Sequence, residues 1–559
     1  MKLARLNSRR PACLTLALSC ALLLAGCGGS GSGYTSGGTP PTYTLGGSIT
    51  GLAASGLVLA NGADTVAPVA NATSFTFPTA LTSGTSYTVT VKTQPGSGVF
   101  CQVNNGTGKV GSAAVTSVTV ACARAWTWMG GANTPNANGV YGTQGMAAVG
   151  NTPGARYDSV SWTDSSGNFW LYGGNGNDST GAVGYLGDLW EYNPGTGQWT
   201  WIGGSVTANT SAVYGTQGTG STSNNPGARA SAVSWTDGSG NLWLFGGYGF
   251  NEAPGAGGLL NDLWKFNMAT GESTWVSGSN ALNGPPVYGT QGSAAATNVP
   301  GAREAATSWI DTAGNLWLFG GDGWDSNGAI ILLNDLWEFS PKTGQWTWVS
   351  GAKVGAAAGV YGTQGTAAAG NVPGARGSAA SWTDSAGNLW LFGGQGFDAN
   401  GNMGSLNDLW KFSPSTGEWI WVSGSNTAGA TGTYGTQGMA AAGNVPGARD
   451  LVVSWTDSAG NLWLFGGDGL DAHGSIGPLS DVWEYQPGTG QWTWVNGPNT
   501  GSTVGVFGTL GVAGSGNSPD ARSSAAGWVD STGALWVFGG FALYSSPASI
   551  APMNDLWRY

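Results

Sequence analysis

Between residues 43 and 124, apolar and polar residues alternate with a period of two along short segments. The segments 73–81, 86–93 and 113–123 show this alternation and are rich in β-branched residues. Turn sequences such as NGAD, TSG and PGSG separate them. This pattern is typical of strands that bury one face. It predicts a small all-β domain over residues 43–124, which we interpret as a spacer.

From Ala125 to Tyr559, short apolar segments recur in sets of four. A segment such as SAVSW leads into a tight turn such as TDSAGN, and LWLFGG follows. A variable loop then precedes NDLWKF, and a second tight turn such as SPSTG precedes QWTWVSG. Each set therefore predicts four short strands joined as an antiparallel meander.

The sets repeat with a period of 73 or 74 residues, which is marked by one arginine in each set. Five of these arginines stand in PGAR and the last stands in PDAR. Self-similarity at a fixed period indicates a propeller or a solenoid. The arginines are Arg156, Arg229, Arg303, Arg376, Arg449 and Arg522.

The motifs PGAR, LWLFGG, NDLWKF and TGQWTW resemble kelch repeats, and the resemblance covers residues 125–559. Kelch repeats form β-propeller blades of four antiparallel strands. The resemblance therefore implies an all-β propeller over residues 125–559. Residues 43–124 resemble the small Ig-like β-sandwich modules that precede propellers in exported bacterial proteins.

The motif count predicts six blades and the way in which the ring closes. DLW or DVW occurs six times, and the WTW-type strand also occurs six times but begins at Trp126, before the first PGAR. The N-terminal strand would then be the outer strand of the last blade. Pairing the first strand with the last removes the free sheet edges.

Tryptophan positions support a structural use of the aromatic residues. Of the 30 tryptophans, 29 fall at repeat positions, where large rings would fill the space between blades. Trp324 alone falls outside the repeat positions, in a predicted variable loop. It is therefore a candidate for a ligand-binding face.

The hexapeptide VYGTQG stands before PGAR in four sets, with TYGTQG in the fifth and VFGTLG in the sixth. We expect it in the long loop between blades, on the same face as the variable loop. Its tyrosine would anchor the loop by packing, while a ring of tyrosines that contacts a ligand is the alternative. The tyrosines are Tyr141, Tyr214, Tyr288, Tyr361 and Tyr434.

The six arginines allow two interpretations as well. A circle of guanidinium groups near the channel could hold carboxylate or sulfate groups of a ligand. Each set also supplies one aspartate in DLW and one in the TDSAG turn. Pairing with these acids is favoured, because an unpaired buried charge is costly.

The charge balance argues against a nucleic-acid partner. Charged residues make up 8% of the chain, the net charge is −11, and no basic run is present to neutralise phosphates. The D-x-N-G turns of the variable loops supply too few oxygen atoms for calcium. We therefore expect no metal and no cofactor.

Residues 1–27 resemble a bacterial lipoprotein signal peptide that ends in the lipobox LAGC. The resemblance implies a lipid on Cys27, and Gly28 after it suggests sorting to the outer membrane. Residues 28–42 are a Gly/Ser/Pro tether. The predicted location is the bacterial cell envelope, periplasmic or surface-exposed, with the membrane contacted through the lipid. Of the other cysteines, only Cys101 and Cys122 remain after the signal peptide, and they predict one disulfide.

Catalytic chemistry is poorly supported by the residues present. Galactose-oxidase-like propellers need two histidines and a crosslinked cysteine at copper, whereas this chain has His473 alone. We therefore expect no copper oxidase activity and assign no catalytic residue. The segment SWTDSAGNLW resembles the Asp-box of sialidases with one extra residue between Asp and Gly, so a sialidase-like carbohydrate-active enzyme is the alternative.

The sequence as a whole favours a non-enzymatic, lipid-anchored binding scaffold. We expect a monomer that binds a protein or glycan ligand on the face that carries the long loops.

Overall fold

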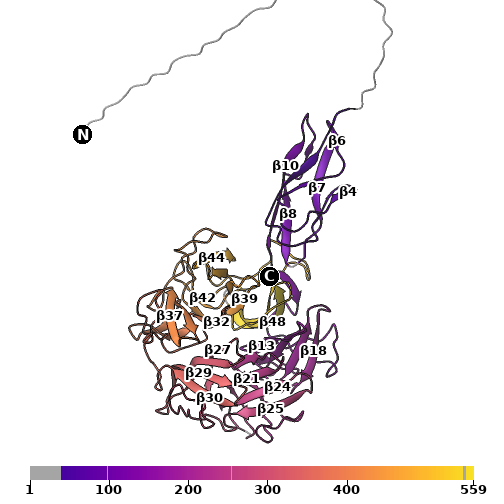
Figure 1. Ribbon diagram of the computed structural model, residues 1–559. Helices are drawn as coiled ribbons and strands as arrows, with labels where there is room; N and C mark the ends of the chain where they lie inside the picture. Colours follow the sequence, from indigo (N-terminus) through magenta and orange to yellow (C-terminus); the bar gives the residue numbers. More distant parts are fainter. Residues whose placement is uncertain (1–39, 97, 254, 546–548) are drawn as a thin grey trace, which may run out of the picture.

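The computed structural model describes residues 40–559, except for residues 97, 254 and 546–548 (Figure 1). The described residues form 48 β-strands and include no α-helix, as the sequence pattern predicts. Accordingly, none of the described segments is a long apolar helix of the kind that could span a membrane.

The N-terminal part of the chain contains two four-stranded sheets with the orders β5-β2-β10-β8 and β4-β3-β7-β9, together with the pair β1-β6. Alternate residues of these strands point into one apolar cluster, which includes Leu45, Phe75 and Val118. The strands are β1 (Thr42–Tyr43), β2 (Leu45–Thr50), β3 (Val58–Asn61), β4 (Asp64–Val66), β5 (Ser74–Thr76), β6 (Leu81–Thr82), β7 (Ser86–Thr93), β8 (Val99–Asn104), β9 (Thr107–Lys109) and β10 (Val115–Arg124).

The predicted disulfide is present in this part of the structure. Cys101 on β8 and Cys122 on β10 are directly opposite each other in the antiparallel register, and their sulfur atoms are bonded. Both cysteines are buried in the apolar cluster. The bond therefore joins two neighbouring strands of one sheet within its core.

The rest of the chain is built from antiparallel sheets that repeat one four-strand order, as in β13-β14-β17-β18. We number the repeats 1 to 6 by their arginines, from Arg156 to Arg522. The first strands are β13 (Val160–Thr163), β20 (Val233–Thr236), β27 (Thr307–Ile310), β32 (Ala380–Thr383), β39 (Val453–Thr456) and β46 (Ala526–Val529). The second strands are β14 (Phe169–Tyr172), β21 (Leu242–Phe245), β28 (Leu316–Trp324), β33 (Leu389–Phe392), β40 (Leu462–Phe465) and β47 (Leu535–Ser545).

The third and fourth strands complete each sheet toward its outer edge. The third strands are β17 (Leu189–Asn193), β24 (Leu263–Asn267), β29 (Ile330–Ser340), β36 (Leu409–Ser413), β43 (Val482–Gln486) and β48 (Ser549–Arg558). The fourth strands are β18 (Gln198–Gly203), β25 (Glu272–Ser277), β30 (Gln345–Ser350), β37 (Glu418–Ser423), β44 (Gln491–Asn496) and, for repeat 6, β11 (Thr127–Gly130). Repeated four-stranded sheets of this kind are typical of propeller blades.

Two sets of contacts describe how the repeats are arranged. The first strands contact one another in the order β13, β20, β27, β32, β39 and β46, and β46 also contacts β13. The strand β11 pairs with β48, so that Trp128 is opposite Trp557. Figure 1 shows the sheets arranged around a common centre, with the N-terminal strands above them.

Large apolar side chains fill the space between successive sheets. The cluster between repeats 2 and 3, for example, joins Trp235 and Phe245 of one sheet to Phe339 and Trp346 of the next. The double glycine of each repeat follows the second strand or, in repeats 3 and 6, lies within it, and it bends the chain sharply. Gly173 has a φ of +66°, and an added Cβ would lie 2.5 Å from the Arg229 carbonyl oxygen. The bend therefore requires glycine.

Beyond the double glycine the variable loop contains a β-hairpin, which also pairs with a short strand that starts at each repeat arginine. These short strands are β12 (Arg156–Tyr157), β19 (Arg229–Ala230), β26 (Arg303–Glu304), β31 (Arg376–Gly377), β38 (Arg449–Asp450) and β45 (Arg522–Ser523). The hairpins are β15 (Asn175–Asn177) with β16 (Val183–Tyr185), β22 (Tyr248–Gly249) with β23 (Gly258–Leu259), β34 (Gln395–Phe397) with β35 (Met403–Ser405) and β41 (Asp468–Leu470) with β42 (Ile476–Pro478). In repeats 3 and 6 they are the ends of β28, β29, β47 and β48.

This pairing brings the end of the blade-linking loop and the variable loop to one face, which we call the long-loop face. Trp324 lies on this face at the end of β28, so the prediction that it lies in a loop was wrong. Its neighbours Ile330 to Leu333 continue the ladder of β28 and β29 and keep the residue in an extended strand.

The N-terminal part contacts the opposite face. The Arg124 guanidinium Nη1 donates a 3.2 Å hydrogen bond to the carbonyl oxygen of Gly533, which lies in a tight turn of repeat 6. The guanidinium also lies 5.6 Å from the ring centroid of Trp463. Gly98 packs against the backbone of Tyr559 at the end of β48. These contacts leave the long-loop face uncovered by the N-terminal strands.

Candidate functional site

Each repeat arginine forms a buried ion pair with the aspartate of the DLW or DVW motif. Arg156 Nη1 lies 2.7 Å from Asp188 Oδ1, and Nη2 donates to Oδ2, so the pair is bidentate. The other pairs have N–O distances of 2.6 or 2.7 Å, and every arginine is at most 1% exposed. The other pairs are Arg229–Asp262, Arg303–Asp335, Arg376–Asp408, Arg449–Asp481 and Arg522–Asp555.

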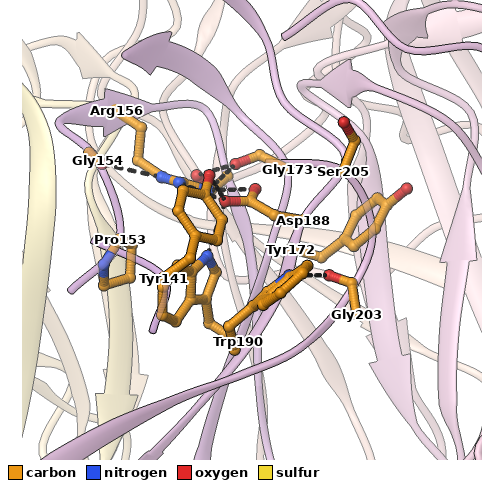
Figure 2. Close-up of polar contacts among 12 residues, drawn as sticks. Tyr141, Pro153, Gly154, Arg156, Tyr172, Gly173, Asp188, Trp190, Gly203 and Ser205 are labelled. Atoms are coloured by element: carbon orange, nitrogen blue, oxygen red, sulfur yellow. Dashed lines mark hydrogen bonds and ion pairs between the residues drawn. The ribbon is translucent and has the colours of Figure 1, made fainter. Parts of the chain in front are cut away.

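The same aspartate accepts two further hydrogen bonds (Figure 2). The Tyr141 hydroxyl and the Trp190 indole each donate to Asp188 Oδ2 at 2.7 Å. Burial by itself would raise the pKa of Asp188, but the Arg156 guanidinium and these donors hold it below its usual value. Burial and the nearby carboxylate raise the pKa of Tyr141, which keeps its hydroxyl protonated as a donor. The charges in this cluster are therefore paired within the protein, and the cluster needs no ligand.

The VYGTQG loop fixes the outer edge of each sheet. In repeat 1, the Gly145 N–H donates to the Trp201 carbonyl oxygen, and the Gln144 side chain donates to the Ile202 carbonyl oxygen. The Tyr141 ring packs across Trp190 and Trp201. The loop thus covers the free edge of the fourth strand, where unpaired backbone groups would otherwise invite another chain.

Four other tyrosines occupy the same position in repeats 2 to 5. Their hydroxyls donate to the DLW or DVW aspartate at 2.6 to 2.9 Å. In repeat 6 the position holds Phe507, which packs on Trp128 and Trp557. The tyrosines are Tyr214, Tyr288, Tyr361 and Tyr434, and each is at most 5% exposed.

The remaining repeated acids also have structural partners. Asp384 in the TDSAGN turn accepts from the backbone N–H of Asn388 and from the Trp390 indole. In the variable loop, Asp325 accepts from backbone N–H groups of Asn327 and Ala329 as an Asx turn does. The segment that resembles an Asp-box therefore uses its aspartate to hold a hairpin turn.

The centre of the long-loop face contains a closed ring of backbone hydrogen bonds that the sequence did not suggest. The second residue after each repeat arginine has a positive φ of 54° to 57° and donates its N–H to the carbonyl oxygen of its counterpart in the preceding repeat. The six bonds measure 2.8 to 3.1 Å. The ring consists of Asp158, Ser231, Ala305, Ser378, Leu451 and Ser524.

Around this ring lies a layer of side chains that we call the mouth. It consists of the residue after each arginine and the residue opposite it on the neighbouring hairpin strand. The mouth residues vary among the repeats, although the arginine that precedes each of them does not. Its pairs are Tyr157–Asn175, Ala230–Tyr248, Glu304–Asp322, Gly377–Gln395, Asp450–Asp468 and Ser523–Phe541.

One side of the mouth is aromatic. Tyr157 packs against Phe541 with ring centroids 5.1 Å apart. Tyr185, which follows Asn175 in the same short sheet, stacks on Tyr248 at 5.3 Å with an angle of 29° between the rings. These four rings are partly exposed on the long-loop face. They offer flat apolar surfaces with polar edges.

The other side of the mouth is acidic. Burial and then the charges of Asp322 and Asp158 raise the pKa of Glu304 to about 7. Burial and then Asp468 raise the pKa of Asp450 to about 7 as well. Each of these carboxyl groups therefore changes its protonation near neutral pH.

A cavity of about 450 Å³ adjoins the acidic side between repeats 4 and 5. Gln395, Ser405, Asp450 and Asp468 line it with polar groups, and Ile476 contributes an apolar wall. The Asp468 Oδ1 atom is buried and has no hydrogen-bond partner among the described residues. The cavity therefore has acceptor capacity that the protein itself leaves unused.

Beneath the ring, the first strands line the axial channel with serine and threonine. A cavity of about 380 Å³ is bordered by residues of β13, β20, β27 and β32. The Ser234 hydroxyl donates to the Ser161 carbonyl oxygen at 3.3 Å, and Ser308 repeats the bond to Ser234. These bonds tie β20 to β13 and β27 to β20.

The structure thus gives the predicted ligand-face residues different places. The arginines and tyrosines are buried, while Trp324 is partly exposed and its indole N–H lies 3.4 Å from Asn283 Oδ1. Cys27, the predicted lipidation site, lies outside the described residues. Within the described residues, no group of three His, Cys, Asp or Glu side chains is placed to hold a metal ion.

No protein-family model and no curated protein matches the chain.

Proposed function

We propose that residues 125–559 form a six-bladed, kelch-type propeller that β11 closes by pairing with β48. The cyclic contacts of the first strands and the closed hydrogen-bonded ring support this architecture. We further propose that residues 43–124 form an Ig-like β-sandwich domain, which the two sheets around one apolar cluster support.

We propose that the protein is an exported binding scaffold whose mouth binds a glycan. The observation that carries this proposal is that the pairs of the mouth differ among the repeats and gather aromatic rings on one side and carboxyl groups on the other, whereas the buried Arg–Asp pairs are the same in all six repeats. Stacked tyrosines suit the apolar face of a sugar ring, and carboxyl and amide groups suit its hydroxyls. A protein ligand, which the sequence also allowed, is less favoured because the cavity of about 450 Å³ that adjoins the mouth has the size of a small-molecule site.

The anchor is proposed to lie on the opposite side from the mouth. Arg124 and Gly98 attach the N-terminal part to the face that carries the tight turns. A lipid on Cys27 and the tether of residues 28–42 would then direct the mouth away from the envelope membrane. If this is right, Cys27→Ala releases the protein from membranes. Continued membrane association of that variant would contradict the anchor.

The binding proposal can be tested on a glycan array with the full chain. We expect binding to a restricted set of glycans that Tyr248→Ala abolishes. Glu418→Gln on the outer strand β37 is the matched control and should bind normally. A wild-type protein that binds no glycan, or equal binding by Tyr248→Ala, would contradict the proposed site.

A carbohydrate-active enzyme of sialidase-like type is the alternative, and one observation favours it. The raised pKa values of Glu304 and Asp450, each about 7, suit a general acid at neutral pH. A panel of chromogenic glycosides distinguishes the two functions. A scaffold gives no turnover, whereas an enzyme gives turnover that Glu304→Gln or Asp450→Asn removes.

A further inference from the structure

The fourth strand of repeat 2 lacks a tryptophan that the other repeats have. Its sequence is ESTW, and Ser273 stands opposite Phe266 where Trp346 stands opposite Phe339 in repeat 3. The other repeats place an indole at this position, and each of these rings is at most 6% exposed. The indoles belong to Trp199, Trp346, Trp419, Trp492 and Trp126.

A cavity of about 410 Å³ lies beside Ser273, between repeats 1 and 2. Its walls include Tyr172, Trp264 and Phe266. The equivalent residues in the next interface surround the Trp346 ring, with centroids 5.4 Å from Phe245, 6.4 Å from Trp337 and 5.1 Å from Phe339. The cavity therefore includes the space that an indole fills elsewhere in the molecule.

The wall of this cavity also differs from the corresponding regions of the other repeats. Gly227 has a φ of +81°, and its carbonyl oxygen accepts a 2.6 Å hydrogen bond from the Tyr172 hydroxyl. Asn225 and Pro226, just before it, line the cavity. The Nε atom of Arg229 has no partner among the described residues, whereas the corresponding atom of Arg303 donates to Gly301. Repeat 2 thus has its own backbone conformation at the edge of the cavity.

We propose that this cavity binds a small planar aromatic molecule of the size of indole. An apolar cavity of roughly 150 Å³ is enough to take up benzene in other proteins, so the volume here is sufficient. Aromatic walls favour tilted and edge-to-face contacts with such a ring. The edge is polar, because Thr222 and Ser223 line the cavity and are exposed, so a ligand with one polar atom can bind without leaving that atom unpaired.

This site is separate from the mouth. It lies between the sheets of repeats 1 and 2 and is lined mainly by the second, third and fourth strands and by residues 222–226 of the loop that links them. Glycan binding at the mouth and aromatic binding at this site can therefore be measured independently. If one of the two binding proposals is contradicted, the other is unaffected.

Isothermal titration of the full chain with indole tests the proposal. We expect one molecule to bind per chain, and we expect Ser273→Trp to lower the association constant at least tenfold by filling the cavity. Ser273→Ala, which keeps the cavity open, is the control and should retain binding. No binding of indole by the wild type, or equal binding by Ser273→Trp, would overturn the proposal.

A second variant tests the role of the missing tryptophan from the other direction. Trp346→Ser opens the equivalent space between repeats 2 and 3, and we expect the stoichiometry to rise from one indole to two. A folded Trp346→Ser protein that still binds only one molecule would contradict the equivalence. Should this variant fail to fold, the comparison of Ser273→Trp with Ser273→Ala still decides the proposal.

Discussion

Arg303 and Glu304 are neighbours in the chain, but they belong to two regions that differ in almost every respect. Arg303 is 1% exposed and its charge is neutralised by Asp335. Glu304 is partly exposed at the mouth, and partial burial and then its nearest acids raise its pKa. The arginine is repeated in every unit, whereas the residue after it is Tyr, Ala, Glu, Gly, Asp or Ser.

The comparison separates the residues that hold the repeats together from those that can recognise a ligand. The buried clusters consist of Arg, Asp and Trp in every repeat, with Tyr in five of the six, and they leave little exposed polar surface. The mouth keeps the same backbone in each repeat but changes the side chains. Identical side chains at equivalent positions therefore indicate a structural role here, and variation on a constant backbone indicates a binding surface.

The largest expected effect comes from breaking a buried cluster. Asp335→Ala leaves the Arg303 guanidinium buried and unpaired, and we expect a loss of about 3–5 kcal/mol in the free energy of unfolding. Chemical denaturation measures this loss. Asp322→Asn at the mouth is the matched control, and we expect it to change the same free energy by about 0.5 kcal/mol or less. A loss below about 1 kcal/mol for Asp335→Ala would contradict the structural role.

A smaller change in the same cluster separates the hydroxyl of the VYGTQG tyrosine from its ring. Tyr288→Phe removes one donor to Asp335, but Arg303 and Trp337 still hold the carboxylate, and repeat 6 already has Phe507. We expect a cost of about 1–2 kcal/mol. Tyr288→Ala also removes the buried ring and should cost about 3–5 kcal/mol. Equal costs for the two variants would show that the ring does not anchor the loop.

The acidic side of the mouth should make the free energy of unfolding depend on pH near neutrality. Because the folded protein raises the pKa of Glu304 from 4.5 to about 7, the folded state holds this proton more tightly than the unfolded state. The free energy of unfolding should therefore fall as the pH rises through that interval, by about 1–2 kcal/mol after allowance for solvent screening. Glu304→Gln should remove this contribution and leave the one that Asp450 makes over the same interval, whereas Glu418→Gln should retain both. An unchanged pH dependence in Glu304→Gln would contradict the claim that the folded protein raises the pKa of Glu304.

Much of the architecture could be predicted because the same pattern of strands and turns occurs in every repeat. Alternating segments such as SAVSW and the glycine pair in LWLFGG determine strands and bends through local physics, and the structure has them at those residues. The disulfide could be predicted from the two cysteines that remain. The buried pairing of the arginines agrees with the interpretation that each repeat supplies its own acid.

The mouth could not be predicted from the sequence. Its residues share a place in the fold but have no residue type in common, so no motif marks them. The ring residues Asp158 and Leu451 share only a positive φ and a bond to the preceding repeat. Glu304 and Asp322 meet through pairing of β26 with the end of β28 across the glycine bend. The cavity beside Ser273 did leave a signal in the sequence, since the WTW-type strands contain eleven tryptophans where a full set would contain twelve.

The most direct test of the separation between the two regions is a pair of measurements on Tyr248→Ala, namely the free energy of unfolding and glycan binding. Because Tyr248 lies partly exposed on a hairpin strand, where it stacks on Tyr185 and donates to the Gly257 carbonyl oxygen, we expect its loss to cost about 1–2 kcal/mol and to abolish binding. A variant that keeps full binding but loses several kcal/mol would show that the mouth is structural, and would contradict the account.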